Sequence, residues 1–359
     1  MAQAAARRIL FSKMNKRPPY IAEHASLAPL TTLHLGGSAR YFATCTSTDV
    51  LKESLQWASR AGIEVQVLGG GSNVVFADQG FDGLVLQIGL RGMQFRGDTA
   101  RIAAGECWDD VVAKSISRGL AGIECLSGIP GLVGATPIQN VGAYGQEVSE
   151  TIASVRAIDR HTLEEVEFGN DACDFAYRHS RFKGIDSDRY VITEVCYALR
   201  GDGQPQLRYG ELRDRVGAKV QSSAGPDALN AVRTAVLALR KSKSMIVDSA
   251  DPNSRSAGSF FVNPVISPAQ FEQLRAQHAT IPSFADANGV KVPAAWLVEH
   301  AGFAKGYRHG GVGISQRHAL ALINCDGSTH ELLELAEHIR DAVEAQFGVR
   351  LQREPVVVE

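Results

Sequence analysis

A serine set between apolar side chains is the first residue of this chain that could do chemistry. It lies in residues 257–264 (AGSFFVNP), where Gly258 lets a ligand approach the backbone and Ser259 presents a hydroxyl that could donate a proton or bind a ligand. The stretch lacks the Gly-x-Ser-x-Gly pattern of a nucleophile elbow, and no Ser-His-Asp order can be read from the sequence. A strand that packs a small domain through Ser-Phe-Phe explains the same residues, so both interpretations stay open.

Charged and phenolic side chains form a second set of candidates. Residues 177–183 (YRHSRFK) include Arg178, and arginine is well suited to bidentate recognition of a carboxylate or a phosphate. Lys243 ends a basic run, and the sequence around Tyr209 predicts a turn with an exposed phenol. On local sequence alone, a solvated surface loop is the favoured explanation for the basic runs. Glu354, near the C-terminus, gains a role only from its context.

Residues 128–145 (GIPGLVGATPIQNVGAYG) hold five glycines, two prolines and no charged side chain. Glycines at this density allow positive φ and close approach of a ligand, and successive N–H groups can form a nest for an anion. A linker is usually polar and repetitive, whereas this segment carries apolar side chains that are costly to leave in water: Ile129, Leu132, Val133, Ile138, Val141 and Tyr144. The composition favours an ordered segment that cradles a ligand.

A second glycine loop, residues 69–73 (GGGSN), follows a predicted strand and precedes another. It matches neither the Gly-x-Gly-x-x-Gly nucleotide fingerprint nor a P-loop, so we interpret it as a β-turn-β hairpin. Its amides could bind phosphate, with Ser72 and Asn73 as side-chain donors, although a tight structural hairpin explains it about as well. Together, two such cradles suit a long ligand with two phosphates.

The elements that must position these residues alternate between strands and helices. Strands are predicted at residues 41–46, 64–68, 74–77, 84–88 and 101–104, and a β-rich region at 152–159, 164–168 and 190–199. Helices are predicted from a Thr48 cap to residue 61, at 108–118, 229–239 and 294–301, from a Ser267 cap, and from a Ser328–Glu331 capping box to residue 347.

The composition indicates a soluble protein of two or three domains. The chain has 359 residues, 45% of them hydrophobic and 21% charged, with a net charge of −2, which gives no electrostatic case for nucleic acid as a partner. No apolar run approaches the roughly 20 residues that a membrane helix needs. Six scattered cysteines and ten histidines lack zinc-site spacing, so we expect no metal, and a reducing, cytoplasmic location. Residues 1–20 read as a disordered basic extension.

Taken together, the motifs resemble those of the UDP-N-acetylenolpyruvoylglucosamine reductases, flavoenzymes of bacterial peptidoglycan precursor synthesis. The resemblance covers about 31–354, and PGxxGxxPxQNxGAYG with AGSFFxNP is its most specific part. Tyr209, in a Tyr-Gly-Glu-Leu context, resembles the type I branch, which has a substrate-covering tyrosine loop. The matching segments are residues 32–37, 68–74, 104–106, 128–145, 177–183, 257–264 and 310–324.

The resemblance implies an α+β protein in which two domains form a vanillyl-alcohol-oxidase-type FAD-binding fold and a smaller α+β domain binds substrate. The implied boundaries are 21–93 with 328–359 for the first FAD-binding domain, 94–244 for the second, and 245–327 for the substrate domain. We expect a monomer that binds FAD non-covalently and uses NADPH, with UDP-N-acetylglucosamine enolpyruvate as substrate.

The resemblance also implies a mechanism and a set of site residues. NADPH reduces FAD, reduced flavin gives hydride to the enolpyruvyl methylene carbon, and Ser259 protonates the adjacent carbon while Arg178 and Glu354 stabilise the intermediate. The implied cofactor contacts are Gly69, Gly70, Gly71, Ser72, Asn73, Gly128, Gly131, Gly134, Gln139, Asn140 and Gly142. The implied substrate contacts are Tyr144, Tyr209, Lys243 and Asn263.

The chain departs from the family pattern at Val356, where many members carry an arginine two residues after the glutamate. Glu354 itself keeps the position of the family's glutamate. Two other functions would leave different signs in the sequence. An oxidase on the same FAD fold would lack AGSFFxNP and would commonly carry a histidine or cysteine for covalent flavin attachment, but neither glycine segment contains a histidine. A non-catalytic nucleotide-binding module would need no serine, arginine and glutamate set.

Overall fold

The computed structural model describes residues 16–359, and the predicted basic extension lies mostly outside the described residues. The chain divides into two compact units. The first comprises 16–25 of the described residues, Ser38–Gly70 and Phe81–Ala238, and the second comprises Ser26–Gly37, Gly71–Gly80 and Leu239–Glu359. Each unit has its own cluster of buried hydrophobic residues. The finer three-domain boundaries stay a prediction.

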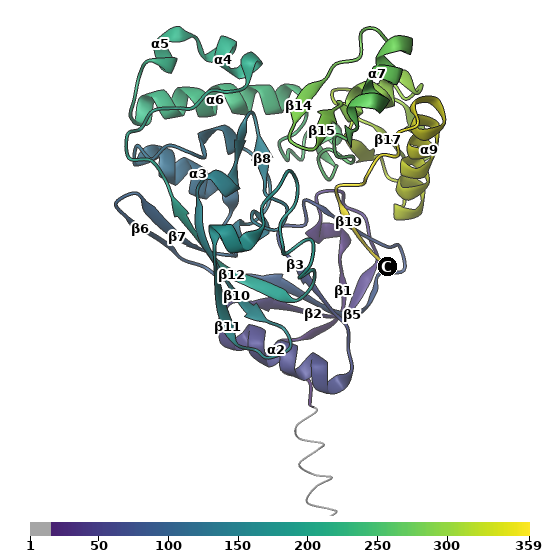
Figure 1. Ribbon diagram of the computed structural model, residues 1–359. Helices are drawn as coiled ribbons and strands as arrows, with labels where there is room; N and C mark the ends of the chain where they lie inside the picture. The colour runs from purple at the N-terminus through teal and green to yellow at the C-terminus, as the bar shows by residue number, and fades with distance from the viewer. Residues whose placement is uncertain (1–15) are drawn as a thin grey trace, which may run out of the picture. The chain divides into compact units, whose positions relative to one another are not determined.

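The first unit contains a four-stranded sheet in the order β1 (Ala22–Ser26), β2 (Ser38–Cys45), β5 (Phe81–Ile88) and β3 (Val65–Leu68). Strands β2 and β3 both pair in parallel with β5. Helix α2 (Thr48–Ala61) packs on this sheet (Figure 1). It is capped by Ser47, whose hydroxyl accepts a hydrogen bond from Val50, so the predicted Thr48 cap is wrong by one residue. Gly62 ends the helix at φ 64°, as its sequence position predicts.

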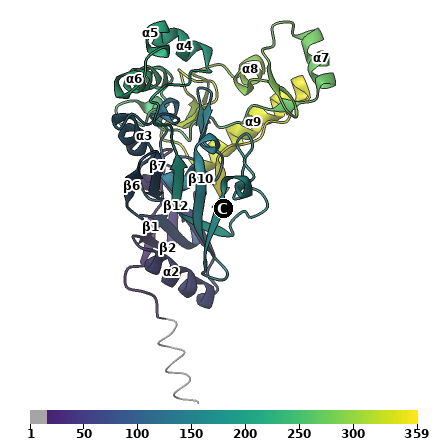
Figure 2. The same cartoon turned by 60° about the vertical axis from the view of Figure 1, so that its left-hand side comes forward.

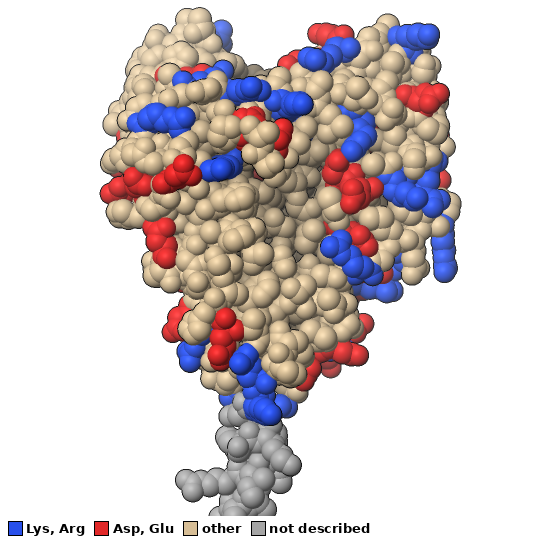
Figure 3. Space-filling model, turned by 180° about the vertical axis from the view of Figure 1, so that it is seen from behind, with Lys and Arg blue, Asp and Glu red and all other residues tan. Residues whose placement is uncertain are grey.

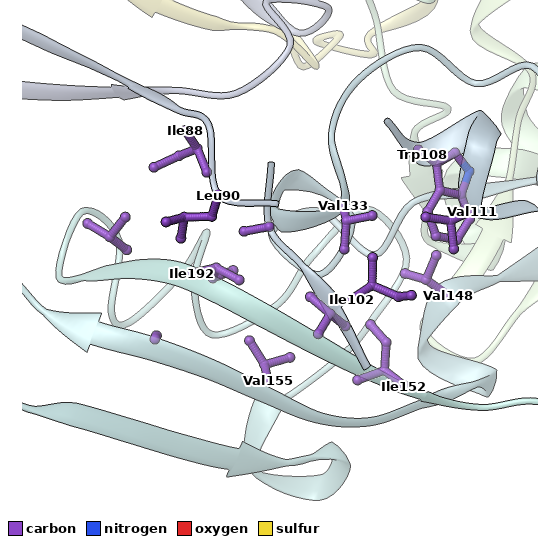
Figure 4. Packing of buried hydrophobic residues seen from close by; sticks show 14 of the residues in the cluster. Ile88, Leu90, Ile102, Trp108, Val111, Val133, Val148, Ile152, Val155 and Ile192 are labelled. Carbon is purple, nitrogen blue, oxygen red and sulfur yellow. The ribbon is translucent and has the colours of Figure 1, made fainter. Parts of the chain in front are cut away.

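A five-stranded antiparallel sheet forms the other layer of the first unit. Its order is β11 (Glu165–Gly169), β10 (Ile152–Asp159), β12 (Tyr190–Ala198), β7 (Thr99–Ala103) and β6 (Met93–Arg96), and Figure 2 shows β7, β10 and β12 side by side. Helix α3 (Trp108–Ser117) follows β7. Its apolar face meets Val133 of residues 128–145 in the core (Figure 4), which confirms that this segment is ordered.

Besides its two sheets, the first unit contains several short elements and one long helix, α6. Residues 128–150 form the turns η3 (Val133–Ala135) and η4 (Val148–Glu150) and a small hairpin of β8 (Gly142–Ala143) and β9 (Gln146–Glu147). The other elements are η2 (Glu124–Leu126), η5 (Asn170–Cys173), α4 (Gly210–Val216), α5 (Ala218–Gln221) and α6 (Pro226–Ser242). The end of α6 belongs to the second unit, and so does the short turn η1 (Ala28–Leu30), which follows β1.

In the second unit, two small antiparallel sheets carry three helices. One sheet has the order β13 (Val265–Ile266), β15 (Gly289–Lys291), β14 (Phe284–Asp286), and the other β16 (Arg308–His309), β17 (Val312–Ile314), β18 (Leu322–Asn324). The helices are α7 (Pro268–Gln277), α8 (Ala294–His300) and α9 (Thr329–Phe347), and η6 (Pro252–Ser254) precedes them. The capping box of Ser328 and Glu331 on α9 is confirmed. Phe260 and Phe261 are buried in this core.

The glycine loop at residues 69–73 is not a hairpin, which corrects the sequence interpretation. Strand β3, before the loop, pairs with β5, whereas β4 (Val74–Phe76), after it, pairs in parallel with the C-terminal strand β19 (Val356–Val358). The two flanking strands therefore belong to different sheets. The chain has to change sheets within the loop, and glycines allow a turn of this kind.

Candidate functional site

In the first unit the two glycine segments pack directly against each other. A Cβ built on Gly70 would lie 2.8 Å from the Cα of Gly131, closer than real side chains pack. At the next turn, the N–H of Gly134 donates to the carbonyl of Ala104 (2.8 Å), and a Cβ on Gly134 would lie 2.7 Å from the Cβ of Ala104. Glycine is therefore required by contact at Gly70 and Gly134. The two glycine segments therefore pack backbone against backbone, with no side chain between Gly70 and Gly131.

One end of residues 128–145 is held by an ion pair that sequence reasoning missed. Oδ1 of Asp109 accepts from the N–H of Gly128 (2.6 Å), which has φ 72°. The Arg233 guanidinium donates a hydrogen bond to each carboxylate oxygen of Asp109, with N–O distances of 2.5 and 2.6 Å. Separations of 19 and 124 residues leave no local signal for this pairing. A bidentate arginine–carboxylate pair thus anchors Gly128, the first residue of the 128–145 segment, to α3 and α6.

Arg178 reaches the other end of the same segment. It stands in a tight turn closed by mutual hydrogen bonds between Ala176 and His179, with φ 54°. Its Nη2 donates to the carbonyl of Gly142 (2.7 Å) and its Nη1 to the carbonyl of Asn140 (3.5 Å). A Cβ on Gly142 would lie 3.2 Å from Nη1 of Arg178, so glycine at this position makes room for the guanidinium.

Asn140 is placed in the protein interior. Its side chain is only 1% exposed. Its amide nitrogen donates to Glu147 (2.7 Å) and to the carbonyl of Ala176 (3.0 Å), while its Oδ1 accepts from Ser149 (3.1 Å). Both amide hydrogens are thus used by protein atoms. The neighbouring Gln139 is half-buried.

Tyr144 and Tyr209 are brought together. Their rings meet edge to face at 5.5 Å between centroids. Tyr144 has φ 50° at the turn of the β8–β9 hairpin. Tyr209 is 40% exposed, as predicted, but it directly precedes helix α4 and is not part of a turn. Partial burial, followed by the charge of Glu211, raises the pKa of the Tyr209 phenol, which keeps it protonated and able to donate a hydrogen bond at neutral pH.

In the second unit, Ser259 and Glu354 are adjacent through backbone pairing. Phe261 and Arg353 form an antiparallel bridge, in which the N–H of Glu354 donates to the carbonyl of Phe260 (2.9 Å). Ser259 directly precedes Phe260, is half-buried, and follows Gly258, which has φ 75°. The structure therefore joins the serine segment to the glutamate near the C-terminus, although 94 residues separate Phe260 from Glu354 in the sequence.

Asn73, at the end of the glycine loop, is hydrogen-bonded to the segment that contains Glu354. The carbonyl of Asn73 accepts from the N–H of Val356 (3.1 Å), and the Asn73 amide donates to the carbonyl of Glu354 (3.4 Å). Gly71 has φ 66°, and a Cβ there would clash with the backbone of Leu30. The loop backbone and the Glu354 segment are thus held in register. Val356 itself is exposed.

Lys243 belongs to a concentration of positive charge. It lies just beyond the end of α6, where Arg240 is buried and donates to the carbonyl of Met245 (2.7 Å). The pKa of His318 reflects the positive potential in this region. Burial first, then the charges of Lys243, Lys305 and Arg240, lower the pKa of His318 from 6.5 to about 4. A region with this potential suits a phosphate or diphosphate.

Asn263 is used to hold the second unit together. Its Oδ1 accepts from the N–H of Ala294 (2.9 Å), the first residue of α8. The four leading N–H groups of a helix need such partners, so this bond fixes the start of α8 to the serine segment. The role predicted for Asn263 in substrate binding stays a prediction.

The lowered pKa of His318 predicts a pH-dependent loss of stability. The neutral imidazole accepts from the N–H of Leu320 at Nδ1 (3.0 Å), and the folded state binds a proton less readily than the unfolded state. Stability should therefore fall as the pH drops from 6.5 towards 4, by up to about 3 kcal/mol from this group. Chemical denaturation of wild type and His318→Gln between pH 7 and 4 should show a shallower loss in the variant. Parallel curves, as expected for the exposed control His161→Gln, would contradict this.

The predicted site residues are divided between the two units. The first unit holds Gly69, Gly70, Gly128, Gly131, Gly134, Gln139, Asn140, Gly142, Tyr144, Arg178 and Tyr209. The second holds Gly71, Ser72, Asn73, Lys243, Ser259, Asn263 and Glu354.

Within 16–359, no group of three or more potential ligand side chains is arranged to hold a metal ion. No helix among those residues has the length and apolar character needed to span a membrane. Charges of both signs are interspersed on the face in Figure 3.

Comparisons with known proteins converge on one family. A model of the C-terminal domain of UDP-N-acetylenolpyruvoylglucosamine reductase matches residues 251–358, and a model of an FAD-binding domain matches residues 39–162. The reductase of Streptomyces coelicolor is 45% identical over 345 residues, with 93% of this chain and 89% of the relative covered. That of Thermobifida fusca is 45% identical over 352 residues, with 94% and 98% covered.

A solved structure shows the same fold. The UDP-N-acetylenolpyruvylglucosamine reductase of Thermus caldophilus superposes with a TM-score of 0.66 at 22% identity, covering 94% of this chain and 98% of that one. Together with the matched FAD-binding domain, this confirms the predicted α+β fold class. The identity, the coverage and both domain matches place this chain in the UDP-N-acetylenolpyruvoylglucosamine reductase family, the FAD-dependent oxidoreductases of peptidoglycan synthesis.

Proposed function

We propose that this protein reduces UDP-N-acetylglucosamine enolpyruvate to UDP-N-acetylmuramate, with NADPH as reductant and non-covalent FAD as the bound cofactor. The relatives that carry this reductase name, and the FAD-binding domain match, support the proposal. We place the reaction in the cytoplasm, because the six cysteines are free and a reducing compartment keeps them so. We also propose that the protein acts as a monomer, which sedimentation would test.

The observation that carries the proposal is the pairing of the serine segment with the glutamate segment. The bond from Glu354 N–H to the carbonyl of Phe260 puts two candidate catalytic residues, Ser259 and Glu354, on neighbouring stretches of backbone. The bond is between backbone atoms, and it brings the segment that carries the serine next to the segment that carries the glutamate. Proton donation next to a stabilising group is the chemistry that this pair suits.

The glycine-rich, charge-free composition of residues 128–145 and the glycines of residues 69–73 support FAD as the ligand. Gly70 and Gly134 let the backbone pack closely because a Cβ on either would clash with protein atoms, and the N–H groups of glycine-rich turns can bind a pyrophosphate. When bound, FAD would accept a hydride from NADPH and supply it to the methylene carbon of the enolpyruvyl group. The cradle residues would hold the cofactor and exclude water from it.

The chain's own residues would then handle charge and protons. Hydride addition at the methylene carbon leaves an enolate-like carbon beside the substrate carboxylate, which the Arg178 guanidinium and Glu354 would stabilise or polarise. Ser259 would donate its hydroxyl proton to that carbon. A serine hydroxyl is a weak acid, so it needs a strongly basic carbon or help from neighbouring groups. Lys243, in its positive surroundings, would hold the diphosphate, with Tyr209 covering it.

The decisive experiment follows flavin and NADPH together. Purified protein should show a flavin absorption spectrum and should oxidise NADPH steadily only when UDP-N-acetylglucosamine enolpyruvate is present. NADH in place of NADPH measures the reductant preference. A colourless protein that takes up no added FAD would refute the proposal. A flavoprotein that is reduced by an alcohol or a sugar, and not by NADPH, would instead be an oxidase on the same fold.

A further inference from the structure

We propose that Asn140 is the positioning residue of Arg178, and that its side chain serves the arginine and not the cofactor. The inference rests on the proposed function for the role of Arg178, and it replaces the cofactor contact that the sequence predicts for Asn140. It concerns hydrogen bonds within the first unit only.

The backbone around Arg178 is in a conformation that needs support. A φ of 54° is uncommon for a residue with a long side chain and is costly unless the surroundings hold it. The turn is only four residues long, closed by the bonds between Ala176 and His179. Anything that holds Ala176 therefore determines where the turn, and Arg178 at its tip, can lie.

Asn140 holds this turn at two points. Its side-chain amide donates to the carbonyl of Ala176 at the base of the turn (3.0 Å), and its own carbonyl accepts from Nη1 of Arg178 (3.5 Å). The carbonyl of Gly142 accepts from Nη2 of the same guanidinium (2.7 Å). Residues 140–142 thus orient the guanidinium plane while the Asn140 side chain fixes the backbone that carries it.

The residue type fits this role better than it fits cofactor binding. Asn140 has φ 46°, a conformation that asparagine tolerates well among residues with side chains. Both amide hydrogens are engaged by Ala176 and Glu147, so the side chain has no N–H left to donate to a ligand. An amide bonded to two protein acceptors in the interior transmits position, because it cannot move without breaking a bond.

The test replaces the amide by a carboxyl. Asn140→Asp keeps the acceptor for Ser149 and the positive φ, but it removes both N–H donors. The matched control is Asn170→Asp, because Asn170 also donates to two carbonyls, those of Ser149 (2.8 Å) and Ile152 (2.7 Å), without contacting Arg178. For each variant the measurements are flavin content, melting temperature, reduction of bound flavin by NADPH, and its reoxidation by UDP-N-acetylglucosamine enolpyruvate.

Asn140→Asp should bind flavin and be reduced by NADPH within about twofold of the control, while reoxidation by substrate slows about 10- to 100-fold, the scale expected for a misplaced catalytic group. Adding Asn140→Asp to Arg178→Ala should slow reoxidation no further, because a residue that acts through Arg178 has nothing to position once the guanidinium is gone. Independent, multiplied effects of the two substitutions would overturn the inference.

A second variant covers the case in which Asn140→Asp folds poorly. The double variant Asn140→Asp with Glu147→Gln restores the side-chain hydrogen bond between positions 140 and 147, with donor and acceptor exchanged. It still leaves the carbonyl of Ala176 without the N–H of Asn140. Its melting temperature should recover while reoxidation by substrate stays slow. If reoxidation recovers together with stability, Asn140 is merely structural. If Arg178→Ala reacts with substrate at the wild-type rate, the proposed role of Arg178 fails, and the inference fails with it.

Discussion

Replacing Ser259 with alanine is expected to slow the reoxidation of reduced flavin by substrate by about 10²–10⁴-fold, the usual contribution of a general acid. Flavin binding and flavin reduction by NADPH should stay within about twofold of wild type. The reason is that Ser259→Ala removes one hydroxyl from a half-buried position and leaves the pairing of Phe261 with Arg353 intact. Without a proton donor, the negative charge that hydride addition leaves on the neighbouring carbon is not neutralised, so hydride transfer out of the reduced flavin slows as well.

Stopped-flow absorbance of the two half-reactions separates these effects. Ser267→Ala is the matched control, because it removes a hydroxyl that caps α7 in the same unit by accepting from Gln270 (3.2 Å). That change should cost about 1 kcal/mol of stability and leave both half-reactions unchanged. If Ser259→Ala slows flavin reduction and reoxidation equally, the serine is structural and the proton comes from elsewhere.

Replacing Gly70 with alanine is expected to weaken FAD binding. The new Cβ would lie 2.8 Å from the Cα of Gly131, and backbone cannot give way as a flexible side chain can, so the two glycine segments must separate. Overpacking of this kind costs about 1–3 kcal/mol, which corresponds to roughly 5- to 150-fold in affinity if it falls on the cofactor site. Titration of the apoprotein with FAD, followed by flavin fluorescence, measures the change.

The neighbouring glycine supplies the control. A Cβ on Gly69 would meet only the Cβ of Ala135 at 3.8 Å, an ordinary contact, and Gly69 does not have a positive φ. Gly69→Ala should therefore bind FAD nearly as tightly as wild type. Equal losses in Gly69→Ala and Gly70→Ala would show that the loop needs glycine for flexibility, and not for the contact with Gly131.

Much of the architecture could be predicted because its signals are local. Helix α9 starts at a serine and glutamate three residues apart, and α2 ends at a glycine with positive φ, both within one turn of the helix itself. The glycine segment at 128–145 showed an unusual density of glycine without charge, and it is ordered. One error was local as well. Ser47 and Thr48 are both good caps, so composition could not choose between them.

The functional detail depended on partners far apart in the sequence. The strand after the glycine loop pairs with β19 instead of β3, a choice made by the C-terminal segment some 280 residues away. The ion pair of Asp109 and Arg233, which anchors Gly128, joins helices 124 residues apart. In the sequence, Glu354 has no feature that distinguishes it from a solvated glutamate near the C-terminus. Only the structure shows that its N–H donates a hydrogen bond to the carbonyl of Phe260.

The sequence by itself determined the end of α2, the start of α9, the two glycine segments, the family and the residue types that can do the chemistry. Each of these is encoded within a few neighbouring residues or in a motif of fixed spacing. Only the tertiary structure decided that Gly70 lies on Gly131, that Ser259 neighbours Glu354, and that the Asn140 amide turns inward to hold the turn of Arg178. Such contacts follow from how whole sheets and helices pack, and a hydrogen bond between distant residues leaves no pattern in the chain between them.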